Sequence, residues 1–230
     1  MMEVRIPPIN QVSFEIVFDF HSHSIWSDGK NTIQEMISVA HARNLTHFAL
    51  TDHYLFRSYR PPFSQIKNPI LYLKAVRDAT LQLPPNFTVF AGLEVNAKST
   101  YDLEELLAAK PDLLLFENYE DDLSILSELV ELADSTNVPI ILAHPFFHLS
   151  DVPFKQIYEI LENSRLIIEL NLISPFNTPE IKKLLDCGLK YSVGSDSHST
   201  DTIGQLSPIY EYLDQNGKCW QFFLTNKSII

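Results

Sequence analysis

Short apolar runs alternate with amphipathic stretches along most of the chain. The apolar runs lie at 15–20, 46–50, 88–93, 112–116, 139–143, 166–170 and 191–193. Runs of this kind are typical of strands that are buried on both faces of a parallel sheet. The amphipathic stretches predict helices at 32–43, 66–83, 103–109, 121–135, 154–163 and 179–187, with a closing helical region over 207–213.

Local signals mark two of the helices. Asn31 or Thr32 can cap the first helix, which carries Glu35 in its first turn. Pro179 suits the start of the helix at 179–187, and Gly188 follows its end.

The order of elements predicts the fold class. A strand followed by a helix, about seven times over, implies right-handed crossovers and a parallel α/β sheet. Seven or eight such units can close into a barrel, and an open doubly wound sheet is the alternative. Nearly every predicted strand is followed by His, Asp or Glu. Because a barrel gathers the carboxyl ends of its strands around one mouth, this placement favours a barrel, which we expect to form a single domain over residues 1–230.

Composition and charge narrow the functional classes. Hydrophobic residues make up 45% and charged residues 20% of the chain, a globular balance. The net charge of −12 argues against broad contacts with a nucleic-acid backbone, which need a surplus of Lys and Arg. It does not oppose a small anionic substrate, because bound cations reverse the field inside a pocket.

The chain shows no membrane or export signal. It lacks a run of 18 uncharged apolar residues, and its first residues lack the apolar core of a signal peptide, so we expect a cytoplasmic protein. Cys187 and Cys219 form no CxxC pair and are expected to be reduced structural residues. The sequence does not indicate the oligomeric state.

Ligand-type residues follow the first strand. In His21-Ser22-His23 the two imidazoles lie two positions apart, so on an extended strand they point to one face and can chelate one cation. Taken alone, such a pair is more often two surface histidines than a metal site. Asp28 follows in an Asp-Gly pair, which is an ordinary turn signal when it stands alone.

The same pattern recurs after the later strands. The polar triplet Thr51-Asp52-His53 follows the second strand directly, and Glu94 lies in an apolar stretch. An ionised carboxylate there is costly unless it binds a metal or pairs with a cation such as Lys98. The remaining candidates at strand ends are His144, Asp196 and His198. A lone histidine such as His144 would more often be a hydrogen-bonded core residue.

Taken together, these residues predict a metal centre. Five of the eight histidines follow apolar strands at the same expected end of the barrel. Imidazole and carboxylate without thiolate suit Zn, Mn or Fe, and more than four ligands imply more than one ion. Two close metals can clamp a phosphoryl group and share a hydroxide that attacks phosphorus. Of the other three histidines, His41 and His47 are expected at the surface, and His148 could reach the mouth.

The segments FDFHSHSIWSDG, FALTDH, GLEVN, LAHP and GSDSH together resemble the polymerase and histidinol phosphatase (PHP) family, from His21 to His198. The resemblance implies a distorted seven-stranded, TIM-like (β/α)7 barrel with a trinuclear metal site. It assigns one metal to His21, His23, Glu94 and Asp196. It assigns a second metal to Glu94 and His144, and a third to Asp28, His53 and His198.

One ligand departs from the family pattern. The family usually places a histidine after the fourth strand, where this chain reads Phe116-Glu117-Asn118-Tyr119. Asn118 is our principal candidate for that position, and Glu117 or His148 is the alternative. Without a histidine there, the site holds either two or three metal ions.

We expect a metal-dependent phosphoesterase acting on a small phosphate monoester or a nucleotide-type phosphoester. Asp196 or His198 would move protons. Arg57 and Arg60, in a loop after His53, and Lys98 are candidates for binding the substrate phosphate. The alternatives are amide or deacetylase chemistry at a similar barrel site, a 5′-end exonuclease, and a metal-binding scaffold without turnover.

Overall fold

The sheet of this protein is built from seven parallel strands. The computed structural model describes residues 17–54, 66, 68–117, 123–145, 153–173 and 176–216. Neighbouring strands follow the order β1-β2-β4-β5-β6-β7-β8. Their bounds are β1 (Phe18–Asp19), β2 (His47–Leu50), β4 (Thr88–Asn96), β5 (Leu113–Glu117), β6 (Ile140–Leu142), β7 (Ile167–Asn171) and β8 (Tyr191–Gly194).

The first and last strands meet, so the sheet curls into a nearly closed barrel. Phe20 N donates to Val193 O at 2.9 Å. Further toward the mouth, Ser22 forms a parallel bridge with Ser197. This closure confirms the predicted seven-stranded barrel and excludes the open doubly wound sheet.

An interruption separates β2 from a short strand, β3 (His53–Tyr54). Both β2 and β3 pair with β4, and the register of β3 places His53 beside Glu94. Between the two strands, Thr51 N donates to Ser22 O at 2.9 Å and Asp52 N donates to Tyr72 Oη at 3.1 Å. The interruption therefore leaves no unpaired backbone N–H at these two positions.

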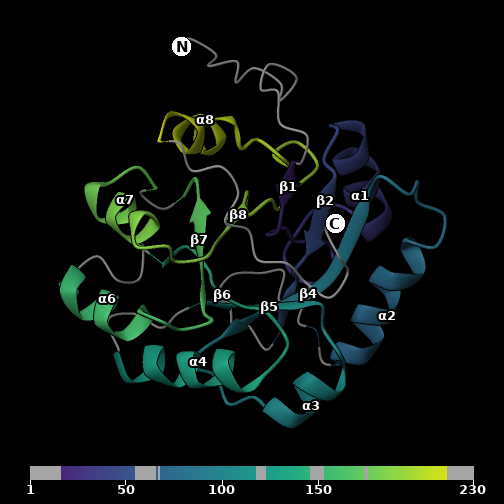
Figure 1. The fold of residues 1–230 in the computed structure, drawn as a ribbon. Coiled ribbons are helices and arrows are strands. Elements are labelled where there is room, and N and C mark those ends of the chain that lie inside the picture. Colours follow the sequence, from purple (N-terminus) through teal and green to yellow (C-terminus); the bar gives the residue numbers. More distant parts are fainter. Residues whose placement is uncertain are drawn as a thin grey trace.

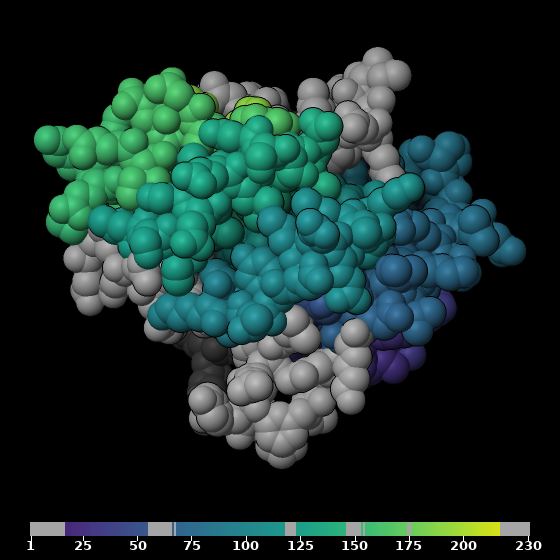
Figure 2. Space-filling model, turned by 90° about the horizontal axis from the view of Figure 1, so that it is seen from below, coloured from purple at the N-terminus to yellow at the C-terminus, as the bar shows by residue number. Residues whose placement is uncertain are grey.

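The helices form an outer ring around the strands (Figure 1). Their bounds are α1 (Ile33–Ala42), α2 (Pro69–Ala79), α3 (Leu103–Ala108), α4 (Leu123–Ser135), α6 (Phe154–Leu161), α7 (Pro179–Asp186) and α8 (Ser207–Gln215). Figure 2, seen from below, shows α3 and α4 in teal covering one side of the barrel, with α2 in blue beside them. No helix in the described parts of the chain has the length and apolar character needed to cross a membrane.

Capping explains where the helices begin. Thr32 forms a capping box with Glu35, which resolves the choice between Asn31 and Thr32. The helix predicted over 66–83 was too long at both ends. Asn68 Oδ1 accepts from Leu71 N at 3.1 Å and Pro69 occupies the first turn, so this helix starts at Pro69.

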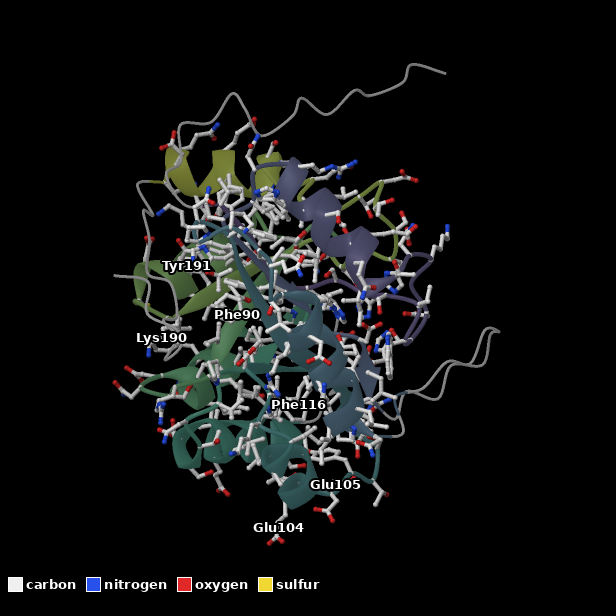
Figure 3. The ribbon with its side chains drawn as sticks, turned by 90° about the vertical axis from the view of Figure 1, so that its right-hand side faces the viewer. Phe90, Glu104, Glu105, Phe116, Lys190 and Tyr191 are labelled. Carbon is white, nitrogen blue, oxygen red and sulfur yellow. The ribbon has the colours of Figure 1, made fainter. Side chains whose placement is uncertain are left out.

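The barrel interior changes from apolar to polar along its strands. The rings of Phe20 and Phe90 meet edge-on at 5.4 Å between centroids. Glu94 lies four residues after Phe90 on the same strand, about 13 Å nearer the carboxyl end. In Figure 3, Phe90 lies among the strands, whereas Glu104 and Glu105 of α3 point outward. Polar side chains thus collect at the carboxyl end, above an apolar core.

One surface prediction was wrong. His41 is exposed as expected, but His47 is the first residue of β2 and is half-buried. Its ring stacks on Phe90 with centroids 6.1 Å apart. Burial lowers the pKa of His47 from its usual value, so we expect it to be a neutral packing residue at the end of the barrel opposite the mouth.

Candidate metal centre

Nine ionisable side chains converge at the carboxyl ends of the strands. They form four overlapping groups, and within each group the candidate ligand atoms lie within 4.8 Å of one another. The members are His21, His23, Asp28, His53, Glu94, Glu117, His144, Asp196 and His198. All the metal-ligand candidates expected from the sequence belong to this set except Asn118, which lies outside the described residues.

The innermost group lies between β1 and β4. His21 Nε2 and His23 Nε2 are 3.1 Å apart, and Glu94 Oε2 lies 3.2 and 3.3 Å from them. Asp196 Oδ1 is 3.4 Å from His21 Nε2 and 3.1 Å from His23 Nε2. Carboxylates from two other segments therefore each lie within 3.4 Å of the Nε2 atoms of both histidines.

Glu94 also joins a second group. Its Oε1 lies 3.3 Å from His144 Nε2, and its Oε2 lies 3.1 Å from His53 Nδ1. On the neighbouring strand β5, Glu117 Oε1 is 3.3 Å from His53 Nδ1. Glu117, the alternative to Asn118, is thus brought into the cluster at the position where the sequence lacks a histidine.

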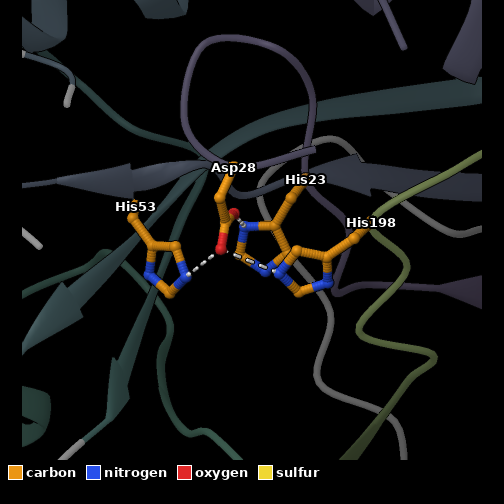
Figure 4. Close-up of side chains that lie close together, drawn as sticks. All are labelled: His23, Asp28, His53 and His198. Carbon is orange, nitrogen blue, oxygen red and sulfur yellow. Dashed lines mark hydrogen bonds and ion pairs between the residues drawn. The ribbon is translucent and has the colours of Figure 1, made fainter. Parts of the chain in front are cut away.

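The outer group surrounds Asp28 (Figure 4). Asp28 Oδ2 lies 3.2 Å from His198 Nε2 and 3.7 Å from His53 Nε2, and Asp28 Oδ1 is 3.8 Å from His23 Nδ1. The His198 side chain is 38% exposed and that of Asp28 is 30% exposed. This group forms the rim of the site, and His23 belongs to both the inner and the outer groups, a dual position that the sequence did not predict.

The charges of the cluster perturb one another. Burial opposes protonation of His21, but the carboxylates of Glu169 and Glu94 outweigh it and hold its pKa well above the usual value. Burial likewise opposes protonation of His53, and its neighbours, Glu94 foremost, raise its pKa to about 9. The nearby imidazoles hold the pKa of Glu94 well below the usual range despite its burial.

Several buried polar atoms in the cluster have no hydrogen-bond partner. They are both carboxylate oxygens of Glu94, Oε1 of Glu117 and Nδ1 of His23. Buried oxygens and nitrogens without partners are costly, and cations bound within the cluster would satisfy them. The donor set of imidazole and carboxylate, without thiolate, fits divalent Zn, Mn or Fe. The residues present therefore fit a cluster of metal ions.

The backbone is strained at two of these residues. His144 has φ of 33° and Asp196 has φ of 52°, both in the left-handed region. Such conformations persist where the surroundings hold them in place, and they gather at functional sites. Both residues follow the ends of strands, His144 after β6 and Asp196 after β8.

A further set of carboxylates supports the cluster, and the sequence did not single them out as site residues. Asp52 accepts four hydrogen bonds from Ser24 and Ser27, which hold the loop that carries Asp28. Asp19 accepts from Ser195 and Gly204. The only signal for Asp52 was the polar triplet after the second strand, and Asp19 lay within a predicted strand.

The expected substrate-binding residues are not part of the cluster as described. Arg57 and Arg60 lie outside the described residues, as does His148. Lys98 is exposed just after β4, where its backbone N–H donates to Asn96 Oδ1 at 2.9 Å. Their proposed contacts with a phosphate stay predictions.

Comparison with known proteins agrees with this architecture. A family model described as the PHP domain matches residues 19–163. A curated relative, the DNA polymerase/3′-5′ exonuclease PolX of Bacillus subtilis, is 22% identical over 208 residues, or 84% of this chain. The chain spans only 36% of the length of that relative.

Two solved structures share the fold at low sequence identity. The histidinol phosphate phosphatase of Lactococcus lactis, solved with Zn, L-histidinol and phosphate, aligns with a TM-score of 0.61 at 16% identity, covering 87% of this chain and 94% of its own. A structure from work on the metal-dependent tyrosine phosphatases YwqE of Bacillus subtilis and CpsB of Streptococcus pneumoniae aligns with a TM-score of 0.61 at 17% identity, covering 88% of each chain.

Proposed function

The chain belongs to the PHP domain family, and from that premise we propose that it is a metal-dependent phosphoesterase acting on a small phosphate monoester. The observation that carries the proposal is the convergence of imidazole and carboxylate donors on buried, unsatisfied oxygens of Glu94 and Glu117. Such a set has no packing benefit, and buried charges without a compensating partner destabilise a fold. The structural relatives include phosphatases that are described as metal-dependent or that hold Zn.

We assign the ions to three ligand sets, the first two of which share Glu94. His21, His23, Glu94 and Asp196 would hold the inner ion. Glu94, His144 and Glu117 would hold the second, with Glu117 supplying the ligand that the family usually takes from histidine. Asp28, His53 and His198 would hold the third at the rim. Zn, Mn and Fe are all compatible with this donor set, and either two or three ions would bind.

When bound, ions of this kind neutralise charge on phosphoryl oxygens and supply a nucleophile near neutral pH. The protein itself contributes a nearly dry inner wall, since His21, His23 and Glu94 are buried. Asp196 and His198 lie nearer to solvent, with side chains 13% and 38% exposed. We propose that these two residues move protons to and from the substrate, while Arg57, Arg60 and Lys98 contact its phosphate.

A nucleic-acid end is the second candidate substrate, because the PolX relative is described as an exonuclease. The net charge of −12 opposes extensive backbone contacts but not the binding of a single terminal phosphoester.

The test combines metal analysis with a substrate panel. Purified protein would be analysed for bound metal and assayed with Mn, Zn or Fe on p-nitrophenyl phosphate, histidinol phosphate, a phosphotyrosine peptide and end-labelled single-stranded DNA. His21→Ala and Asp196→Ala should lose metal and hydrolysis together while remaining folded. His41→Ala, at an exposed position on α1, is the control and should retain both.

Each outcome has a distinct meaning. Full activity in His21→Ala or Asp196→Ala would refute the assigned inner ion. Tight metal binding without hydrolysis of any phosphoester would identify a scaffold instead. Hydrolysis of an amide or acetyl substrate that inorganic phosphate does not inhibit would show that the reaction class is wrong.

A further inference from the structure

A buried carboxylate on β7 lies behind the cluster and contacts two of its members. Glu169 is 1% exposed and lies in the middle of β7. Its Oε1 lies 2.9 Å from His21 Nδ1, and its Oε2 accepts from the backbone N–H of His144 at 2.7 Å. Each oxygen of this one side chain thus engages a residue that we assign to a different metal ion.

The contact with Glu169 determines which nitrogen of His21 faces the cluster. A carboxylate can only accept, so the hydrogen in this contact belongs to His21 Nδ1. In the neutral ring that metal binding requires, His21 Nε2 then carries the lone pair, and this atom is the one that lies 3.2 Å from Glu94 Oε2 and 3.4 Å from Asp196 Oδ1. Glu169 therefore fixes both the tautomer and the ring orientation that metal binding requires.

The contact with His144 acts through the backbone. His144 has a φ of 33°, a conformation that needs support from its surroundings. The hydrogen bond from its N–H to Glu169 Oε2 provides that support at the residue where β6 has ended. The side chain of His144 then reaches Glu94 Oε1 at 3.3 Å.

The neighbouring strand leaves space for this carboxylate. A Cβ at Gly194 would lie 2.0 Å from Glu169 Oε1 and 2.4 Å from the Cβ of His21. Neither approach is sterically tolerable, so a side chain on β8 at this position would displace the Glu169–His21 pair. Glycine is required here for close approach and not for an unusual φ angle.

We propose that Glu169 is a positioning residue that orients His21 and His144 for metal binding, and that Gly194 is required because it accommodates the Glu169 carboxylate. The inference rests on the proposed metal centre, but it concerns binding and not turnover. Removing a partner of this kind behind a metal-binding histidine typically weakens metal affinity by about 10–100-fold.

The first experiment measures Zn affinity by competition with a chelator. Glu169→Gln keeps the shape but can satisfy only one of the two N–H donors with its single carbonyl oxygen, and Glu169→Ala satisfies neither. We expect affinity to fall in the order wild type, Gln, Ala, with about a 10–100-fold loss for Gln. Glu159→Gln, an exposed glutamate on α6, is the matched control and should bind Zn like the wild type.

The second experiment follows His21 directly by NMR of the Zn-loaded protein with ¹⁵N-labelled histidine. The wild type should show a protonated His21 Nδ1 whose hydrogen exchanges slowly with water, and Glu169→Ala should lose that signal even at saturating Zn. A purely structural role would lower folding stability without changing this signal.

The third experiment is a double-mutant cycle on unfolding. Gly194→Ala should destabilise the protein, and the loss should be smaller in the Glu169→Ala background, because the nearest clash has gone.

The outcomes separate this inference from the proposed function. If Glu169→Gln and Glu169→Ala bind Zn with wild-type affinity and keep the His21 signal, the inference is wrong even when the enzyme is an active phosphoesterase. If the protein binds Zn and shows these effects but hydrolyses no phosphoester, the proposed function fails while the positioning role holds. Additive effects of Gly194→Ala and Glu169→Ala would refute the role of Gly194.

Discussion

Asp52 offers a quantitative test of how the rim of the site is held. Its side chain is buried, and its Oδ1 accepts from Ser24 N at 2.7 Å, Ser27 N at 3.0 Å and Ser27 Oγ at 2.7 Å. Its Oδ2 accepts from Ser24 Oγ at 2.8 Å. We expect Asp52→Ala to destabilise the fold strongly and Asp52→Asn to do so only moderately.

The magnitude follows from the donors that each variant leaves without a partner. In Asp52→Ala the two hydroxyls can rotate to other acceptors, and Ser27 N–H keeps Ser24 O as a second acceptor at 3.1 Å, but Ser24 N–H loses its acceptor. A buried N–H without a partner costs about 1–3 kcal/mol and the lost hydrogen bond of Ser27 about 0.5–1.5 kcal/mol, so the loss should be roughly 1.5–4.5 kcal/mol. In Asp52→Asn the carbonyl oxygen can keep the three contacts of Oδ1, and the loss should be about 1–2 kcal/mol.

Urea unfolding of metal-free protein measures these differences without a contribution from metal binding. Asp78→Ala is the control, because its partner Lys74 is exposed and such pairs contribute less than about 1 kcal/mol. The reasoning fails if Asp52→Ala unfolds within about 0.5 kcal/mol of the wild type, a change that is ordinary for surface substitutions. It also fails if Asn destabilises as much as Ala.

Two further predictions concern protonation and metal choice. His53 has a pKa of about 9 in the folded metal-free protein, against roughly 6.5 when the chain is unfolded. Protonated His53 therefore contributes fully to the stability of the fold below about pH 6.5, and this contribution is lost as the pH rises through about 9. Metal-free protein should therefore unfold at a lower urea concentration at pH 9.5 than at pH 7. Calorimetry in buffers of different ionisation enthalpy should detect the release of protons when Zn binds. The absence of proton release would contradict the assignment of His53 as a ligand. Glu117→Gln should lower the number of metal ions that the protein retains after dialysis. Glu117→His should retain the ions, and in a competition measured by metal analysis the metal preference of the protein should shift from Mn toward Zn. Unchanged metal content in Glu117→Gln would exclude Glu117 as a ligand.

Sequence patterns predicted the members of the cluster because the architecture repeats them. In a parallel barrel every strand delivers the residues after its carboxyl end to the same mouth, so His21 and His23, far from Asp196 in sequence, could be grouped without knowing any distance. Glu94 was predictable for a second reason, since a carboxylate in an apolar run needs a partner.

The supporting residues were not predictable, because their partners are distant in the chain. Glu169 lies within an apolar run and contacts His21, 148 residues away, so no local pattern marks it. The interruption between β2 and β3 depends on contacts of Thr51 and Asp52 with Ser22 and Tyr72, which only the closed barrel brings together. Local capping by Asn68, by contrast, was a visible signal that should have shortened the second helix at its start.

The place where the barrel closes gives the metal centre a part in folding. His21 and His23 follow β1 on one side of that junction, and Asp196 and His198 follow β8 on the other. Beside them, Ser195 N donates to Asp19 Oδ1 although the two residues are 176 positions apart in the chain. A metal ion bound by residues from both sides would cross-link the first strand to the last, and its binding energy would offset the entropic cost of closing so long a loop. During synthesis the two histidines that follow β1 emerge long before Asp196, so this link between the ends of the sheet can form only after β8 has been made.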